Sequence, residues 1–184
     1  YPGESGGKAV AEVLFGDYNP GGRLPLTYYK SLKDLPDFND YDITKGRTYQ
    51  YFKGDVLYPF GYGLSYTTFK YSNLQISDGL NEILVSFQLK NTGKYAGDEV
   101  AQIYVQLPSR NEIMPIKELK GFRRITLKKG EEQEITIKLR KDLLRYWDET
   151  QGKFLHPSGT YTIMVGASSA DIRLQQSLTI DMNQ

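Results

Sequence analysis

The sequence of 184 residues contains no cysteine and a single histidine, His156. Without thiols the chain has no disulfide, no thiolate metal site and no cysteine nucleophile. One imidazole cannot build a histidine-rich metal site, so we expect no metal and no cofactor. The 23 basic and 22 acidic side chains leave a formal charge of +1. That charge gives no electrostatic reason to bind nucleic acid.

Long hydrophobic runs are also missing. No apolar stretch approaches the roughly 20 residues that span a bilayer, so we expect no membrane partner. Hydrophobic residues make up 39% and charged residues 24% of the chain, which is typical of a globular protein of one or two domains. The sequence begins at Tyr1 rather than at a methionine, which predicts a fragment or a processed product.

Aromatic residues are unevenly distributed along the chain. Of the 24 Phe, Tyr and Trp residues, eleven lie between Tyr28 and Tyr66. After Thr67 the sequence changes to short alternating runs separated by turn residues. We therefore predict two parts with a boundary near Thr67, namely residues 1–66 and residues 67–184.

The first part is predicted to hold little regular structure. Residues 8–15 have apolar side chains at helical spacing and are followed by Gly16, which predicts a short amphipathic helix. Residues 23–28 are predicted to be extended, and Pro25 confines them to a sheet edge or an irregular stretch. Residues 29–66 have little periodicity but many rings, which rarely stay exposed in such numbers. We expect an aromatic-rich linker that packs along another surface.

The second part is predicted to be mainly β. In residues 82–90, apolar side chains at Ile83, Val85, Phe87 and Leu89 form one row on one face of a strand. Similar runs recur, separated by turn residues. The predicted strands are 69–76, 82–90, 101–107, 119–127, 135–139, 161–167 and 178–182. This pattern predicts a seven-stranded antiparallel sandwich of the immunoglobulin or fibronectin type III class.

Two local features of the sandwich are also predicted. Gly121 interrupts the fourth strand and indicates a β-bulge. Residues 141–148 are expected to form a helical turn in one connection, because Leu143, Leu144 and Trp147 have the spacing to cap one end of the core.

The glycine-rich start of the chain invites two catalytic readings. Residues 3–7, GESGG, match the G-x-S-x-G nucleophile elbow and lead into the predicted helix. An elbow needs a buried strand before it, however, and the only base, His156, lies in a turn of the second part. A glycine-rich helix entry is therefore favoured over a Ser5 hydrolase. A phosphate loop is disfavoured as well, because the Lys-Ser/Thr ending is absent.

Carboxylate pairs carry out glycoside chemistry, but the sequence alone selects no pair among the 22 acids. The neighbours Asp98 and Glu99, and likewise Asp148 and Glu149, would point to opposite faces of an extended strand. We therefore interpret both pairs as solvated loop charges. The rings of the linker could stack on sugars only if they were exposed, and core or interdomain packing is favoured.

Several segments in order along nearly the whole chain resemble the C-terminal part of glycoside hydrolase family 3, which contains β-glucosidases and β-xylosidases. They are PGESGG at 2–7, AEVLFGDYNPGGRLP at 11–25, GRTY at 46–49, LYPFGYGLSY at 57–66, KNTG at 90–93, GDEV at 97–100, KELKGF at 117–122 and GTY at 159–161. This many segments in register make a chance match a negligible explanation.

The resemblance implies a parent enzyme with a (β/α) barrel, an α/β sandwich and a fibronectin type III-like domain, which hydrolyses glycosides with retention of configuration. Residues 1–66 would be a remnant of the α/β sandwich domain plus the linker, and residues 67–184 the fibronectin type III-like domain. The family's nucleophile lies in the barrel and its acid/base usually lies upstream of the Pro-Gly-Glu segment. No catalytic, substrate-binding or metal-binding residue is therefore expected here.

We predict that the chain braces the catalytic domains of an exo-acting β-glycosidase and is inactive alone. Its partners would be the upstream catalytic domains of the same polypeptide, and an oligo- or aryl-β-glycoside substrate only through the full enzyme. Self-association of the fragment is a further expectation. The residues predicted to pack between domains are Arg47, Tyr49, Tyr51, Phe52, Tyr58, Phe60, Tyr62 and Tyr66.

Two other classes of function stay open at this point. A freestanding fibronectin-type module that binds glycan or protein would need exposed ring platforms. A Ser5 esterase would need a base beside that serine. The family resemblance implies that the parent is periplasmic or secreted, whereas the substrate, glucoside or xyloside, is not decided by these residues.

Overall fold

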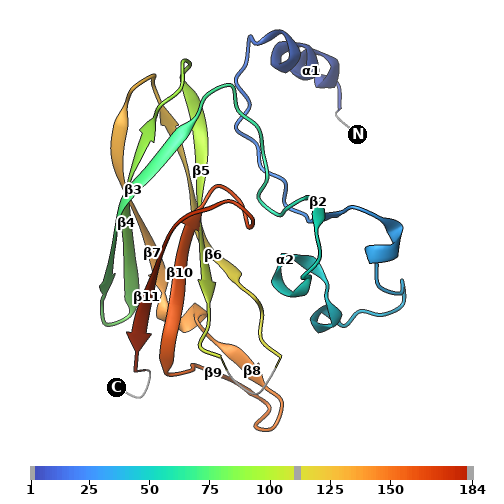
Figure 1. The fold of residues 1–184 in the computed structure, drawn as a ribbon, viewed down its shortest axis with the longest axis vertical. Helices are drawn as coiled ribbons and strands as arrows, with labels where there is room; N and C mark the ends of the chain where they lie inside the picture. Colours follow the sequence, from blue (N-terminus) through green and yellow to red (C-terminus); the bar gives the residue numbers. More distant parts are fainter. Residues whose placement is uncertain (1–2, 110–112, 182–184) are drawn as a thin grey trace.

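The computed structural model describes residues 3–109 and 113–181. Two packed sheets form most of the fold (Figure 1). One sheet has the strand order β3-β4-β7, the other has the order β11-β10-β5-β6, and all neighbouring strands run antiparallel. The strands are β3 (Phe69–Asp78), β4 (Glu82–Asn91), β5 (Gly97–Gln106), β6 (Glu118–Leu127), β7 (Glu132–Arg140), β10 (Gly159–Gly166) and β11 (Ile172–Ile180). The predicted seven-stranded sandwich is confirmed; Met182, its predicted last strand residue, lies outside the described residues.

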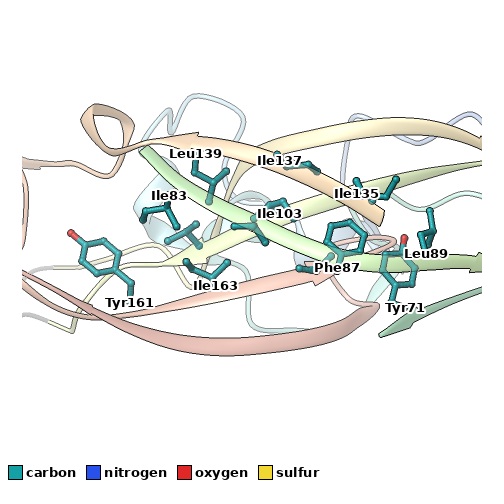
Figure 2. Close-up of a cluster of buried hydrophobic side chains, with 14 of the residues drawn as sticks. Tyr71, Ile83, Phe87, Leu89, Ile103, Ile135, Ile137, Leu139, Tyr161 and Ile163 are labelled. Atoms are coloured by element: carbon teal, nitrogen blue, oxygen red, sulfur yellow. The ribbon is translucent and has the colours of Figure 1, made fainter. Parts of the chain in front are cut away.

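The core lies between the two sheets (Figure 2). Ile83, Val85, Phe87 and Leu89 on β4 are at most 1% exposed, as the alternation of apolar residues predicts. β5 and β10 contribute alternate residues from the facing sheet, and Tyr71 of β3 stacks on Phe87 with ring centroids 5.7 Å apart. Burial of apolar area at about 25 cal/mol per Å2 makes this core the main stabilising contribution to the domain.

The predicted bulge at Gly121 is present. Ile103 pairs with Gly121 but Tyr104 pairs with Leu119, so Lys120 is the extra residue on β6. A Cβ at Gly121 would lie 2.9 Å from a methyl group of Ile137 on the other sheet. The close approach of the two sheets therefore requires glycine there.

The connection after β7 differs from the prediction. Only Lys141–Leu143 form a helical turn, and the chain then enters a hairpin of β8 (Tyr146–Asp148) and β9 (Lys153–Leu155). Extended backbone imposes a period of two, so Leu144, Tyr146 and Asp148 are buried while the residues between them are exposed. Leu143 and Trp147, which the prediction placed on the core, are 41% and 49% exposed.

The first 66 residues form α1 (Gly6–Phe15) and an arm, defined here as residues 17–66. Gly16 ends α1 with φ +84°, a left-handed conformation that suits glycine. The arm's regular elements are the short pair β1 (Tyr28–Tyr29) with β2 (Val56–Tyr58), the 3-10 turns Leu32–Asp34 and Ile43–Lys45, and α2 (Thr48–Tyr51). None of the helices within the described ranges has the length and apolarity to cross a membrane.

The strand predicted at 23–28 is shorter and later than expected. Only Tyr28 of that range lies in β1. Leu24 instead exchanges backbone hydrogen bonds with Gly61 and Tyr62, at 2.8 Å each. Pro25 follows immediately and has no N–H to extend this ladder. The two ends of the arm therefore run side by side along the sandwich (Figure 1).

Two adjacent leucines provide a matched test of the corrected connection. Leu144→Ala should lower the free energy of unfolding by about 2–5 kcal/mol, because Leu144 is fully buried. Leu143→Ala should change it by less than about 0.5 kcal/mol, because that side chain is exposed. Urea unfolding of both variants measures the difference. Equal losses would contradict the assignment of the inward-facing residue.

Candidate functional site

The arm docks on the outer face of β5, the face opposite the core. The Tyr49 ring stacks on Phe60, with centroids 4.5 Å apart, and meets the edge of Tyr104 from β5 at 5.8 Å. The Leu119 N–H donates a hydrogen bond of 2.9 Å to the Tyr49 hydroxyl oxygen. Ile103 and Val105 on β5 point into the core. Because side chains alternate along a strand, Tyr104 between them points outward. One strand thus serves two packing layers.

Gln102, the other outward residue of this part of β5, joins three segments of the chain. Its amide nitrogen donates to the carbonyl oxygens of Gly61 at 3.2 Å and Ala167 at 2.6 Å. The Tyr104 hydroxyl donates to its amide oxygen. Gln102 is only 3% exposed, and buried polar groups without partners are costly. The network therefore fixes the arm at Gly61.

Gly61 is a point of close approach between the arm and the sandwich. Its φ is +81°, and a Cβ built there would lie 2.1 Å from the Gln102 amide oxygen. Both the backbone conformation and the space exclude a side chain. The neighbouring carbonyl of Phe60 accepts a 2.9 Å hydrogen bond from the Ser169 N–H. The backbone of residues 60–61 therefore packs directly against the sandwich, without an intervening side chain at Gly61.

An ion pair with little exposure links the arm to the sandwich a few residues further along β5. The Arg23 guanidinium lies 2.6 Å from the Glu99 carboxylate, and the side chains are 11% and 6% exposed. Glu99 occupies the same alternating row as Ala101, on the side of β5 that faces the core. It also accepts a 2.8 Å hydrogen bond from the Val100 N–H. Arg23 is thus the cation that permits a carboxylate there.

The interpretation of Asp98 and Glu99 as solvated loop charges is therefore wrong. Both lie on β5, where Asp98 forms an ion pair with Arg124 and accepts a 2.6 Å hydrogen bond from the Thr126 hydroxyl. The two side chains do diverge to opposite faces, as expected. For the other pair, Asp148 is buried and caps a turn, accepting from the Gln151 N–H at 2.8 Å, whereas the second acid is exposed.

Asn19 fastens the two ends of the arm to the loop before β5. Its side-chain nitrogen donates to the Ala96 carbonyl at 2.8 Å. Its oxygen accepts from the Ser65 hydroxyl at 3.0 Å and the Tyr66 N–H at 2.8 Å. The Tyr66 hydroxyl donates to the Val13 carbonyl in α1 at 2.6 Å. Asn19 therefore ties both ends of the arm to the sandwich, and Tyr66 extends the connection to α1.

The eight residues predicted to pack between domains separate into three groups. Tyr49 and Phe60 contact the sandwich, as described above. Tyr51 lines a groove shared by the arm and the β8–β9 hairpin. The others stabilise the arm itself: Phe52 meets Tyr29 at 4.9 Å, Tyr58 lies 5.2 Å from Tyr62, Tyr66 bonds to α1, and Arg47 donates to the carbonyls of Asp37 and Asp40.

α1 carries an uncovered apolar surface next to the site. Val10 is 54%, Leu14 72% and Phe15 84% exposed. Gly6 is its only buried residue. An isolated helix of ten residues is marginal in water, and clustered exposed apolar side chains mark a contact surface. The helix therefore has the properties of an element that lacks its packing partner.

The catalytic readings of the first residues find no geometric support. Ser5 precedes α1 at one end of the molecule, whereas His156 follows β9 at the other end (Figure 1). The His156 Nδ1 lies 3.2 Å from the Leu144 carbonyl oxygen. In the described part of the chain, no three His, Asp or Glu side chains gather in a way that could hold a metal ion.

Tyr49 and Phe60 were among the predicted packing residues, but five other residues that dock the arm were missed by the sequence analysis. These are Asn19, Arg23, Glu99, Gln102 and Tyr104. One signal was available: Glu99 falls in the row that continues with Ala101, Ile103 and Val105, and a charge in an apolar row indicates a buried partner. Nothing local identified Arg23 as that partner, because 76 residues separate the two.

The site and fold together define a two-part chain in which an aromatic arm is fastened to a fibronectin type III-like sandwich. Residues 1–66 match the Glycosyl hydrolase family 3 C-terminal domain, and residues 99–169 match the Fibronectin type III-like domain. The chain is thus the C-terminal part of a glycoside hydrolase family 3 protein, homologous to β-glucosidases and β-xylosidases.

Individual relatives agree with this assignment. The chain is 44% identical to a xylan 1,4-beta-xylosidase of Xylanibacter ruminicola, covering 99% of this chain and 21% of that protein. It is 37% identical to a periplasmic beta-glucosidase of Salmonella typhimurium, covering 94% of this chain and 24% of that protein. The chain therefore spans about a fifth to a quarter of the length of these relatives.

Solved structures show the same arrangement of arm and sandwich. The beta-D-glucoside glucohydrolase of Trichoderma reesei superposes with a TM-score of 0.87 at 33% identity, over 98% of this chain and 29% of that chain. Beta-glucosidase 3B of Thermotoga neapolitana, solved with glucose, gives a TM-score of 0.88 at 34% identity, over 95% of this chain and 26% of that chain.

Two arginines test the contribution of the ion pair to docking. Arg23→Ala leaves the Glu99 carboxylate without its cation and should cost about 3–5 kcal/mol. Arg140→Ala removes a guanidinium that is 69% exposed and pairs with Asp142 rather than with the arm, so it should leave the free energy of unfolding nearly unchanged. Amide hydrogen exchange should accelerate in residues 17–66 of the first variant only. The same acceleration in both would contradict the proposed anchoring.

Alkaline pH should also loosen the arm. Burial raises the pKa of the Tyr49 phenol above its usual value near 10. The docked state holds this proton more tightly, so its stabilisation is complete below about pH 10 and falls as the pH rises above that value. Subtilisin cleavage of the arm, followed from about pH 8 to about pH 11, should increase less in Tyr49→Phe than in the wild type. Tyr41→Phe, at an exposed position, should behave like the wild type, and indistinguishable curves for all three proteins would contradict the role of Tyr49.

Proposed function

We propose that this chain is the structural C-terminal part of an exo-acting β-glycosidase and that it braces the catalytic domains. In this proposal residues 1–66 are the remnant of an α/β sandwich domain with its linker, and residues 67–184 are the fibronectin type III-like domain. The observation that carries the proposal is the combination of a firmly docked arm with the uncovered apolar face of α1.

The bracing follows from the direction of the contacts. Asn19, Arg23 and Gly61 fix the arm to the sandwich by polar contacts that tolerate little displacement. α1 leads into this fixed arm and leaves Leu14 and Phe15 exposed. A partner sheet that covers α1 would then be held at a set position relative to the sandwich. That partner is proposed to be the upstream part of the same polypeptide.

The proposed activity belongs to the full-length enzyme. It is the retaining hydrolysis of terminal β-glucosides or β-xylosides, with the nucleophile and the acid/base supplied by the upstream domains. Errors of about 1 Å in the placement of catalytic groups cost on the order of a hundredfold in rate. A brace at the domain boundary therefore affects catalysis without touching the substrate.

The names of the relatives support the substrate class and the location. One relative is a xylan 1,4-beta-xylosidase and another is a periplasmic beta-glucosidase. We accordingly propose oligo- or aryl-β-glycosides as substrates and a periplasmic or secreted parent. No bound group is needed for retaining hydrolysis by two carboxylates, so the proposal includes no cofactor.

The decisive experiment is to read the DNA upstream of the Tyr1 codon and to assay the encoded protein. We expect an in-frame barrel of about 250 residues or more. The full-length protein should hydrolyse p-nitrophenyl β-glucoside or β-xyloside, and the 184-residue chain should not. A start codon and signal peptide immediately upstream would overturn the proposal and favour a freestanding binding module.

The apolar face of α1 generates a separate prediction. In the full-length protein, Leu14→Glu with Phe15→Glu should lower stability by several kcal/mol, since each large side chain contributes about 1.5–3 kcal/mol when buried, and should shorten the half-life of activity on heating. Leu80→Glu, at a position that is 90% exposed, is the control and should change neither. In the isolated chain this face should drive self-association that the double substitution abolishes, as light scattering would show. Equal behaviour of both variants would contradict the role of α1.

A further inference from the structure

A second surface differs in character from α1. It is a groove of about 470 Å3 between the arm, the segment that leads into β6 and the β8–β9 hairpin. Its lining includes Tyr51, Glu118, Arg145, Trp147, Glu149 and Phe154. The volume falls in the range of small-molecule sites, which typically combine rings with a few polar groups.

Two exposed rings form one wall of this groove. Trp147 on β8 pairs with Phe154 on β9 across the hairpin. The ring planes are inclined at 74° with centroids 5.2 Å apart, and the side chains are 49% and 52% exposed. The short hairpin fixes this arrangement, because Tyr146 and Asp148 on the opposite face are buried. The rings are therefore a rigid platform open to solvent.

The polar groups of the groove are positioned beside that platform. The Arg145 guanidinium carbon lies 4.3 Å from the centroid of the Phe154 ring, a cation–π contact that orients its donors. Glu149 is exposed on the same side of the groove. Glu118 lies 3.1 Å from the Lys120 ammonium, so its charge is balanced. The positive charge of Arg145 and the negative charge of Glu149 cancel each other.

We propose that this groove binds a neutral oligosaccharide, with a pyranose ring stacked on Trp147 and its hydroxyls bonded by Arg145 and Glu149. The C–H face of a pyranose is apolar and flat, whereas its rim carries hydroxyls that need both donors and acceptors. A guanidinium and a carboxylate supply these next to an aromatic plane. The absence of a net charge matches an uncharged ligand better than a phosphate or a peptide of one sign.

A protein partner is the less suitable occupant. The cores of protein interfaces are depleted of charged side chains, and the exposed face of α1 has that composition, whereas the groove places Arg145 and Glu149 against its rings. The choice of β-1,4-linked over α-linked chains rests on the proposed function of the parent. β-1,4-linked chains are extended ribbons with flat faces, which suits stacking of one sugar ring on the plane of Trp147.

The chain provides its own probe, because Trp147 is the only tryptophan. Titration of the isolated chain with xylohexaose or cellohexaose should give a saturable change in its fluorescence, and maltohexaose should give none. Calorimetry of Trp147→Ala should then show at least about a fivefold loss of affinity, the lower bound for loss of one stacking contact. Glu149→Gln, an exposed change that preserves the fold, should weaken binding several-fold.

Tyr58→Ala is the matched control, since that ring is also exposed but lies outside the groove, and its affinity should equal that of the wild type. No fluorescence change up to millimolar β-linked sugar would overturn the proposal. A response that Trp147→Ala or Glu149→Gln leaves intact in calorimetry would overturn the assigned groove, and an equal response to maltohexaose would overturn the β-linked class. None of these outcomes bears on whether the full-length protein is a glycosidase, which the enzyme assay decides.

Discussion

The structure depends on the burial of β5 on both of its faces. One face contributes Ala101, Ile103 and Val105 to the sandwich core, and the other carries Gln102 and Tyr104 beneath the arm. A strand of an antiparallel sandwich usually leaves one face in water. Here that face instead receives an arm that has only short regular elements. The sandwich and the arm therefore form a single body although only the sandwich has a hydrophobic core.

The two faces are stabilised by different interactions. The inner face is apolar and its contribution scales with buried area. The outer face is held by oriented groups, the Gln102 amide and the Tyr49 hydroxyl, and the Arg23–Glu99 ion pair adds a contact to the arm from the inner side of the strand. Such contacts contribute modest net free energy each, but an unpaired member is costly. These contacts consequently determine where the arm lies but add little to the free energy of unfolding. A brace between domains requires a fixed position of this kind.

The sequence predicted the elements that follow a period and missed those fixed by distant partners. The seven strands and the bulge at Gly121 follow from local alternation and glycine chemistry. The hairpin after Leu144 was mistaken for a helix because three apolar residues also fit helical spacing. The anchors Asn19 and Arg23 could not be predicted, since their partners on the sandwich lie 76 or more residues away and their turn-rich surroundings have no periodicity.

The uncovered face of α1 and the groove beside the β8–β9 hairpin differ in a way that indicates different occupants. α1 exposes the aliphatic side chains of Val10 and Leu14 and the ring of Phe15. Because these side chains carry no charge, burying them against a partner costs no desolvation of charge. The hairpin groove mixes rings with Arg145 and Glu149, which keep their favourable hydration only if the occupant is itself polar. A dry domain contact therefore suits α1, and a hydrated ligand suits the groove. Both can be occupied at once, because α1 and the β8–β9 hairpin lie at opposite ends of the sandwich (Figure 1).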